Sequence, residues 1–196
     1  MLWRYLLDLN AQAKSDLRRR LRRDRELGFA PRSWLHVSLA REIQGALVIA
    51  SYLSYEFEPQ TIDINSELTR MGKTLLIPRT LPDRDIEWVP WDGLPSSLRR
   101  NGRILEPVGE KFSDESLIDA VIVPALHIDS EGNRMGQGGG SYDRALSRIS
   151  AWKLALVNST EFGNELLPVE PHDQKINAVA TPTLLVRFTP GEVIHL

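Results

Sequence analysis

The sequence predicts an α/β fold, in which one domain of three layers places a mostly parallel sheet between flanking helices. Short apolar runs alternate along the chain with segments of helical periodicity, which is typical of parallel strands joined by helices. The length of 196 residues and the apolar content of 42% suit a single domain over residues 1–196. No internal repeat or low-complexity tract divides the chain.

Helical periodicity occurs in four segments. They are expected over about residues 11–27, from Pro31 onward, over 61–70 and over 141–150. In the first, Leu17 and Leu21 are i,i+4 neighbours, and Gly28 follows as a stop signal. The second would bury a stripe made of Leu35, Leu39 and Ile43.

Strands are expected where short apolar runs occur without helical periodicity. These runs are residues 46–50, 73–78, 118–124, 153–157, and a final pair at 178–181 and 184–188. The segment between Thr80 and Glu110 differs, because four prolines interrupt it and Trp88 and Trp91 lie among them. We expect a long connection with one edge strand there, of the kind that builds the wall of a ligand site.

Composition and charge limit the possible functions. The absence of cysteine excludes disulfides, thiolate metal sites and cysteine nucleophiles. The formal net charge is −2, yet residues 18–25 form a strongly basic run. Three interpretations of that run stay open: a nucleic-acid-binding surface, the solvated face of a helix, or cations of which one or two reach an anionic ligand.

Membrane insertion and secretion are not expected. No apolar stretch approaches the ~20 residues of a membrane span. Residues 1–8 lack the basic region and the long apolar region of a secretory signal. We therefore expect a cytoplasmic protein.

A glycine-rich loop at residues 132–144 follows a buried strand and precedes a helix. Its glycines, which let a phosphate approach the backbone N–H groups, are Gly136, Gly138, Gly139 and Gly140. The following helix would add its free N–H groups, Asp143 would hold a divalent cation, and Arg134 would neutralise another oxygen. The loop matches neither the P-loop nor the dinucleotide fingerprint, so a plain flexible glycine turn stays an alternative.

Six short motifs occur along the chain in a fixed order. The longest is Pro124-Ala125-Leu126-His127-Ile128-Asp129 followed by residues 132–144, which compares with PGLAFD and GxRLGxGxGYYDR. The others are Lys14 to Arg18 for KxxLR, Glu58 to Thr61, Gly72-Lys73 with Pro78-Arg79 for GKxxxxPR, Glu106-Pro107, and Leu167 to Asp173 with Thr181-Pro182 for LPxExHD…TP. In these motifs the chain resembles the 5-formyltetrahydrofolate cyclo-ligase family, also called methenyltetrahydrofolate synthetase.

The resemblance implies an enzyme that cyclises 5-formyltetrahydrofolate to 5,10-methenyltetrahydrofolate, with ATP and Mg²⁺ as cofactors. In such a reaction the formamide oxygen is phosphorylated to an imidate phosphate, the N10 amine attacks the activated carbon, and phosphate departs. This chemistry requires charge neutralisation, positioning and water exclusion rather than a covalent nucleophile. The implied partners are a reduced folate and ATP, without nucleic acid, and we expect a monomer or a weak dimer.

The resemblance also implies roles for residues around the phosphates. Lys14 and Arg18, four apart on one helical face, would contact them, although a solvated pair is the alternative. The full ATP-binding set is Lys14, Arg18, Arg134, Gly136, Gln137, Gly138, Gly139, Gly140, Tyr142 and Asp143. Asp143 and Asp173 would hold Mg²⁺, which prefers oxygen ligands. Without a metal, Asp173 is an ordinary turn residue.

At the folate end, Glu58 would lie near N10, where a carboxylate can orient the amine or accept its proton. Arg134 and Tyr142 complete the implied catalytic set. Trp88 and Trp91 would form an apolar wall for the folate rings, or else only anchor their loop. The remaining residues are expected at the surface or in structural roles: Arg19, Arg20, Arg22, Arg23 and Arg25, and His36, His127 and His172.

Departures from the family pattern concentrate at the folate end. Ala125 replaces a glycine, Ser141 replaces the first tyrosine of YYD, and His127 and Ile128 replace small and aromatic residues. Three hypotheses therefore stand: the cyclo-ligase itself, a divergent member that uses ATP on another formamide or amine, and a nucleic-acid-binding module built on the arginine-rich helix.

Overall fold

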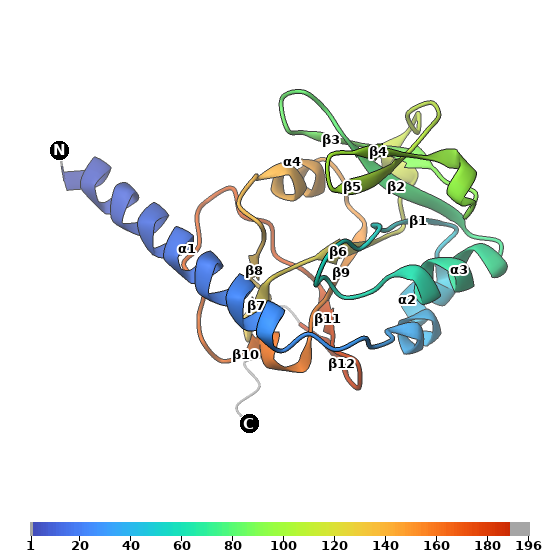
Figure 1. The fold of residues 1–196 in the computed structure, drawn as a ribbon. Coiled ribbons are helices and arrows are strands. Elements are labelled where there is room, and N and C mark those ends of the chain that lie inside the picture. Colours follow the sequence, from blue (N-terminus) through green and yellow to red (C-terminus); the bar gives the residue numbers. More distant parts are fainter. Residues whose placement is uncertain (1, 189–196) are drawn as a thin grey trace.

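A seven-stranded sheet forms the centre of the molecule (Figure 1). The computed structural model describes the backbone of residues 2–188 and the side chains of residues 11–188. The strand order is β12-β11-β9-β6-β1-β2-β3, in which the five inner strands run parallel and the two edge strands run antiparallel to their neighbours. The inner strands are β1 (Val48–Ala50), β2 (Thr74–Thr80), β6 (Ala120–Pro124), β9 (Trp152–Leu156) and β11 (Ala178–Ala180), and the edges are β3 (Ile86–Pro90) and β12 (Leu185–Arg187). The predicted mostly parallel sheet is confirmed.

Both faces of this sheet are covered. In β6, Ala120 and Ile122 belong to one buried cluster, whereas Val121 and Val123 belong to the other. The first cluster also contains residues of the 3₁₀ turn η1 (Leu35–Leu39), α2 (Arg41–Gly45) and α3 (Ile62–Arg70), and the second contains residues of α4 (Ser141–Ser147). Strands buried on both faces explain the continuous apolar runs in the sequence and confirm the three layers.

The N-terminal helix α1 (Leu2–Leu27) ends where the sequence predicts but begins earlier than residue 11. Leu17 and Leu21 pack against a small buried cluster beside the glycine loop. The expectation that Arg25 stays at the surface is wrong. Its guanidinium is buried, pairs with both oxygens of Glu161 at 2.6 Å and donates to the carbonyl of Ala125. Arg25 therefore fastens the last turn of α1 to the domain.

The second predicted helix is wrong in length and in two of the three residues of its buried stripe, since only Ile43 is buried as predicted. The 3₁₀ turn η1 and the five-residue α2 take its place, because Ala40 between them is extended, with φ −63° and ψ 135°. Leu35 and Leu39 are exposed, and Trp34 and Val37 are buried instead. A 3₁₀ turn has three residues per turn, so it buries different positions from the α-helical stripe assumed in the prediction.

The segment from Thr80 to Glu110 holds more structure than the single edge strand expected. After β3 come the 3₁₀ turn η2 (Pro95–Ser97) and a hairpin of β4 (Leu98–Asn101) and β5 (Ile104–Pro107). Glu106 fixes this hairpin to the sheet, because its buried carboxylate accepts from the backbone N–H of Thr80 and from the amide of Asn101.

A second, three-stranded sheet not predicted from the sequence carries the glycine loop. Its strands are β7 (His127–Asp129), β8 (Arg134–Met135) and β10 (Phe162–Gly163), in the order β10-β7-β8. The turn between β7 and β8 is held by buried Asp129, which accepts from the N–H groups of Glu131 and Asn133. The remaining elements are the 3₁₀ turns η3 (Glu115–Leu117) and η4 (Ser159–Glu161). None of the described helices is long and apolar enough to cross a membrane.

Candidate active site

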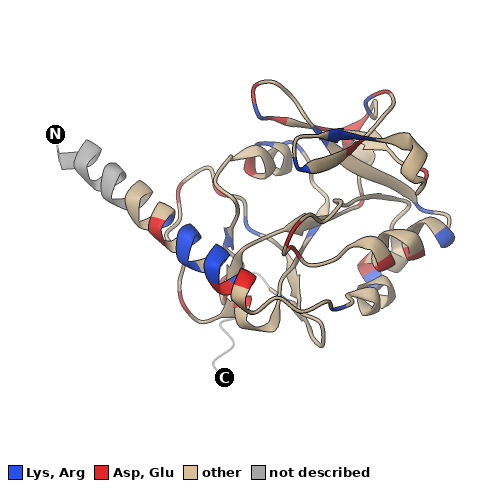
Figure 2. Ribbon diagram, in the orientation of Figure 1, with Lys and Arg blue, Asp and Glu red and all other residues tan. Residues whose placement is uncertain are grey.

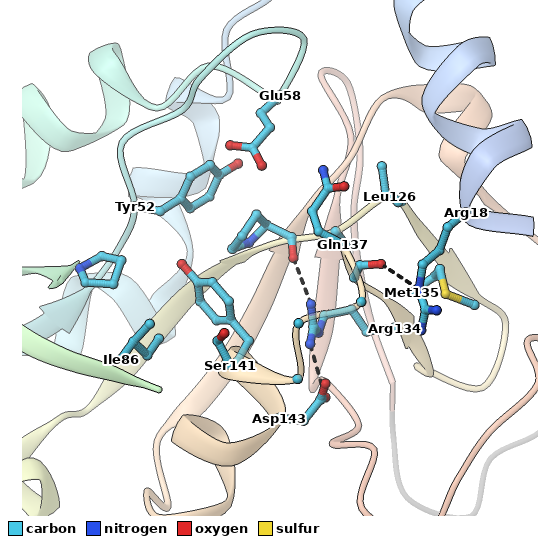
Figure 3. Close-up of a pocket in the computed structure, with 18 of the residues that line it drawn as sticks. Arg18, Tyr52, Glu58, Ile86, Leu126, Arg134, Met135, Gln137, Ser141 and Asp143 are labelled. Atoms are coloured by element: carbon cyan, nitrogen blue, oxygen red, sulfur yellow. Dashed lines mark hydrogen bonds and ion pairs between the residues drawn. The ribbon is translucent and has the colours of Figure 1, made fainter. Parts of the chain in front are cut away.

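A cavity of about 480 Å³ opens where β2 and β6 end, between α1 and the sheet. Its walls come from α1, the loop after β1, the β4–β5 hairpin, the glycine loop and residues 170–173. The predicted site residues that line it are Lys14, Arg18, Glu58, Arg134, Gly136, Gln137, Gly138, Gly139, Gly140, Tyr142, Asp143 and Asp173. Residues distant in the sequence thus meet at one place, at the carboxyl ends of parallel strands. Figure 3 shows Glu58 and Tyr52 on one side of this cavity and Arg18 on the other.

The glycines of the loop are required by close approach as well as by backbone angle. Gly138 has a φ of +96°, and a Cβ there would lie 3.2 Å from Nε of Arg18. Gly140, with a φ of +69°, is the N-cap of α4, and a Cβ there would lie 2.9 Å from Arg144. Because Gly138 and Gly140 carry no side chain, the backbone of the loop can lie in contact with the side chains of Arg18 and Arg144.

Two arginines of α1 hold the loop in place. Arg18 donates from Nε to the carbonyl of Gly136 at 3.3 Å, and Arg22 donates to both the side-chain and backbone oxygens of Gln137 at 2.7 Å. Neither arginine has an ion pair with a carboxylate within the described part of the chain. Their positive charges are therefore available to an anion at the loop.

Asp143 lies in an ion pair with Arg134, at 3.1 Å. Figure 3 shows this pair. Arg134 also donates to the carbonyl of Pro124, and its guanidinium lies over the ring of Tyr142, 5.7 Å from the ring centroid. Asp143 accepts further from the backbone N–H of Gln174. The predicted neighbours Arg134, Tyr142 and Asp143 are therefore one connected group at the start of α4.

Lys14 and Asp173 meet directly. The buried ammonium of Lys14 lies 2.6 Å from Asp173 and 2.7 Å from Glu170. Glu170, His172 and Asp173 each offer a potential ligand atom, and these atoms lie within 4.8 Å of one another. Sequence reasoning missed Glu170 and assigned His172 a structural role, although the motif LPxExHD contains all three.

Glu58 is a buried carboxyl group with few compensating charges. The residue is 6% exposed, and among the described residues its carboxyl accepts one hydrogen bond, a 3.4 Å contact from the N–H of Tyr55. Burial raises the pKa of Glu58 to about 7, while that hydrogen bond and the charge of Arg25 lower the pKa only in part. A carboxyl that titrates near neutrality is suited to accept a proton from a bound amine.

Two tyrosines complete the surroundings of Glu58. The Tyr52 hydroxyl donates to the carbonyl of Pro59, and burial raises the pKa of Tyr52 well above its usual value. Burial also raises the pKa of Tyr142. Both phenols therefore stay neutral and serve as packing surfaces or hydrogen-bond donors.

Trp88 and Trp91 are not brought to the cavity. Trp88 is fully buried in the core, where its ring meets Tyr142 edge-on at 6.3 Å, and Trp91 packs against the other cluster. Both lie on or beside β3, whose ladder with β2 turns Trp88 toward the core. The apolar wall of the cavity instead comes from Tyr52, Ile77, Ile86 and Ile104.

The residues that depart from the family pattern lie in defined surroundings. Ser141 donates from Oγ to the carbonyl of Arg84, which ties the β2–β3 turn to the first turn of α4. Ala125 is buried beside Arg25. His127 is buried, and neither of its ring nitrogens has a hydrogen-bond partner. Of these three, Ser141 and Ala125 line the cavity.

Comparison with known proteins agrees with this geometry. Residues 10–182 match the sequence model of the 5-formyltetrahydrofolate cyclo-ligase family. A 5-formyltetrahydrofolate cyclo-ligase of Mycolicibacterium smegmatis is 32% identical, covering 78% of this chain and 80% of that protein. The enzyme of the same name from Escherichia coli K12 is 29% identical over 70% of this chain and 79% of its own. The NMR structure of Aquifex aeolicus 5,10-methenyltetrahydrofolate synthetase shares the fold, with a TM-score of 0.77, 24% identity, and coverage of 93% of this chain and 96% of that chain.

Proposed function

We propose, because the chain belongs to the 5-formyltetrahydrofolate cyclo-ligase family, that it uses ATP and Mg²⁺ to cyclise 5-formyltetrahydrofolate to 5,10-methenyltetrahydrofolate. One observation carries the proposal. A single cavity joins a glycine-rich loop with one available arginine, Arg18, to a buried carboxyl group that titrates near neutrality. The first feature suits a nucleotide and the second suits an amine nucleophile.

The glycine loop and Arg18 would receive the transferred phosphoryl group. Backbone N–H groups at Gly138 and Gly139 and the guanidinium of Arg18 concentrate positive charge at one spot. ATP supplies the phosphoryl group that turns the formamide oxygen into a leaving group, as an imidate phosphate. Water must be excluded at this stage, and the location of the loop beneath α1 favours such exclusion.

Asp143 and Asp173, with Glu170 beside the latter, would hold Mg²⁺. Carboxylate oxygens are the ligands that this ion prefers, and it commonly bridges one or two of them to substrate phosphates. When bound, the ion would neutralise phosphate charge. Each carboxylate already has a cation partner, Arg134 or Lys14, so the same two cations would also face the phosphates.

Glu58 would accept the proton that N10 loses when it attacks the activated carbon. Its raised pKa makes it a base of suitable strength for this transfer at neutral pH. Tyr52 and Ile77 provide apolar surface beside it for the pterin ring. Arg134, held by Asp143 and by the Pro124 carbonyl, would neutralise charge on the departing phosphate.

The direct test mixes purified protein with ATP, Mg²⁺ and 5-formyltetrahydrofolate and follows the absorbance of the methenyl product. We expect an ATP-dependent rise that Asp143→Asn reduces strongly. Asp63→Asn, an exposed change on α3 away from the cavity, is the matched control. The absence of an ATP-dependent rise would contradict the cyclo-ligase hypothesis and favour the divergent member that uses ATP on another formamide or amine.

Nucleic-acid binding is less well supported. Although α1 carries a dense run of basic residues (Figure 2), most of them have partners in the fold. Arg19 pairs with Asp16, Arg20 with Glu165, and Arg25 with Glu161. A surface whose cations are paired has little net charge to offer a phosphate backbone. The cytoplasmic location and the monomeric or weakly dimeric state stay predictions.

A further inference from the structure

A second cavity, of about 420 Å³, adjoins the first. The two share four lining residues, which form the boundary between them: Tyr55, Glu58, Leu126 and Gln137. The second cavity extends from this boundary toward the end of α1 and the tip of the β4–β5 hairpin. Its own residues are Arg22, Arg25, Glu26, Glu56, Phe57 and Arg103. The reaction proposed above uses none of these six.

Three arginines line this cavity, but their charges are not equally available. Arg25 is matched by Glu161 within the fold. Arg103, at the hairpin tip, pairs with Glu56 at 2.8 Å, and both side chains are exposed, so this pair is weak. Arg22 has only the neutral oxygens of Gln137 as partners among the described residues. An incoming anion would therefore find one available cation and a second that is loosely held.

We propose that this second cavity binds the glutamyl carboxylates of the folate substrate, with Arg22 and Arg103 as the residues that recognise them. The inference rests on the proposed function, because that function places N10 beside Glu58. N10 joins the pterin portion of a folate to its aminobenzoyl-glutamate portion. A substrate with its N10 at the boundary between the cavities must therefore extend into both.

The orientation of the substrate follows from what occupies the two ends. The far end of the first cavity, with the glycine loop, Asp143 and Asp173, is taken by ATP and Mg²⁺ in the proposed function, so the tail cannot extend there. The pterin rings instead suit the apolar part of the first cavity, around Ile77 and Ile86. The tail is thereby directed past Glu58 to the arginines of the second cavity.

The second cavity also offers an aromatic surface for the aminobenzoyl ring. Phe57 lines it, and the ring of Phe57 is supported edge-on by Phe29 at a centroid distance of 5.4 Å. In the chain, Phe57 stands between Glu58 and Glu56, the ion-pair partner of Arg103, and this matches the order of groups along the substrate: amine, ring, carboxylates. Glu26 and Glu56 are the opposing charges, and Glu56 competes with the substrate for Arg103.

The test compares equilibrium binding of tetrahydrofolate with that of its diamide, in which both glutamyl carboxylates are neutral. We expect wild-type protein to bind tetrahydrofolate about tenfold more tightly, in line with charge-assisted hydrogen bonds to two arginines. Arg22→Gln and Arg103→Gln should each weaken tetrahydrofolate binding by about threefold to fivefold and leave the affinity for the diamide unchanged. Because Arg22 also holds Gln137, the affinity for ATP is measured in the same variants, and Arg103→Gln should leave it unchanged.

Matched controls and a variant of opposite sign make the test decisive. Arg23→Gln on α1 and Arg100→Gln on the hairpin remove one exposed positive charge each without touching the cavity, and both should behave as wild type. Glu56→Gln should tighten tetrahydrofolate binding about twofold, since Arg103 loses its competitor. Equal binding of the two ligands by wild type, or equal weakening of both by the arginine variants, would overturn the inference.

Turnover is measured separately, so that the two proposals can fail independently. Formation of the methenyl product without any preference for the charged tail would contradict the proposed tail site but support the cyclo-ligase activity. A preference for the charged tail without turnover would support the tail site and contradict the cyclisation.

Discussion

The two ends of the main cavity are built in opposite ways. At the glycine-loop end, charged side chains are fixed by ion pairs, such as Arg134 with Asp143 and Lys14 with Asp173 and Glu170. At the other end, Glu58 is buried with a weak hydrogen bond and no ion pair among the described residues. Fixed, paired charge suits the binding of a highly charged phosphate chain, whereas an unpaired buried carboxyl suits a group that changes protonation during the reaction.

The largest expected effect comes from removing the carboxyl at the weakly paired end. Glu58→Gln keeps the shape of the side chain but cannot accept a proton from N10. We expect kcat to fall by about 10²- to 10⁴-fold, as is typical when a general base is lost, with the KM for ATP unchanged. Formation of the methenyl product measures both. Glu110→Gln, an exposed change outside the cavity, is the control. A rise in the KM for ATP alone would show that the two ends are not separate in function.

Adding one carbon atom at Gly138 should weaken ATP binding at the glycine-loop end. Gly138→Ala puts a Cβ 3.2 Å from Arg18 at a φ of +96°, which a side chain rarely adopts. We expect the KM for ATP to rise by about tenfold while folate binding stays the same. Gly45→Ala, where a Cβ meets no atom within 4 Å and φ is not positive, should change neither value. An unaffected KM in the Gly138 variant would argue that the loop does not hold phosphate.

The pH dependence of stability sharpens the comparison further. Burial raises the pKa of Glu58 from 4.5 to about 7, so its contribution to stability is fully present below pH 4.5 and is lost as the pH rises through 7. The shift corresponds to a loss on the order of 3 kcal/mol. The difference in free energy of unfolding between Glu58→Gln and wild type should therefore favour the variant more at pH 8 than at pH 5. Denaturant unfolding at the two pH values measures this, and the same gain at both would contradict the raised pKa.

For activity, the same group gives the opposite trend. As a base, Glu58 must be ionised, so kcat/KM should rise with pH and level off above about 7. A rate profile without a transition near this value would remove the proton-accepting role.

The smallest effect is expected where this chain departs from the family pattern. Ser141→Ala removes the hydrogen bond from Oγ to the Arg84 carbonyl, while Arg144 still donates to that carbonyl. We expect a loss of stability of about 1 kcal/mol and little change in activity. Ser147→Ala, which removes only a local bond within α4, serves as the comparison in thermal unfolding. A large loss of kcat in the Ser141 variant would mean that this hydroxyl acts on the substrate.

The sequence was most informative where neighbouring residues act together. Arg134, the glycines from Gly136 to Gly140 and Asp143 lie within ten consecutive positions, so one motif reveals all of them. The parallel strands were found for a similar reason, since burial on both faces leaves uninterrupted apolar runs. The strands β7, β8 and β10 have two or three residues each, too few for any periodicity to appear.

Side-chain partners between distant segments could not be predicted. Arg25 looks like one of six arginines in a basic run, and only the fold brings Glu161 and the Ala125 carbonyl to it. Trp88 and Trp91 attract attention as large aromatic residues in a proline-rich segment, but the pairing of β3 with β2 directs Trp88 into the core. The burial that raises the pKa of Glu58 is likewise a property of packing, which the short motif around it does not encode.

Helix α1 sets a length scale for whatever the two cavities bind. Lys14 and Arg18 reach one cavity and Arg22 and Arg25 the other, all from a single straight element. At about 1.5 Å per residue, roughly 16 Å of helix axis separates the first of these residues from the last. A single-residue insertion between Arg18 and Arg22 would turn one pair relative to the other by about 100° and leave one of the two cavities incomplete. This stretch of α1 should therefore tolerate many exchanges of side chain but no change in length.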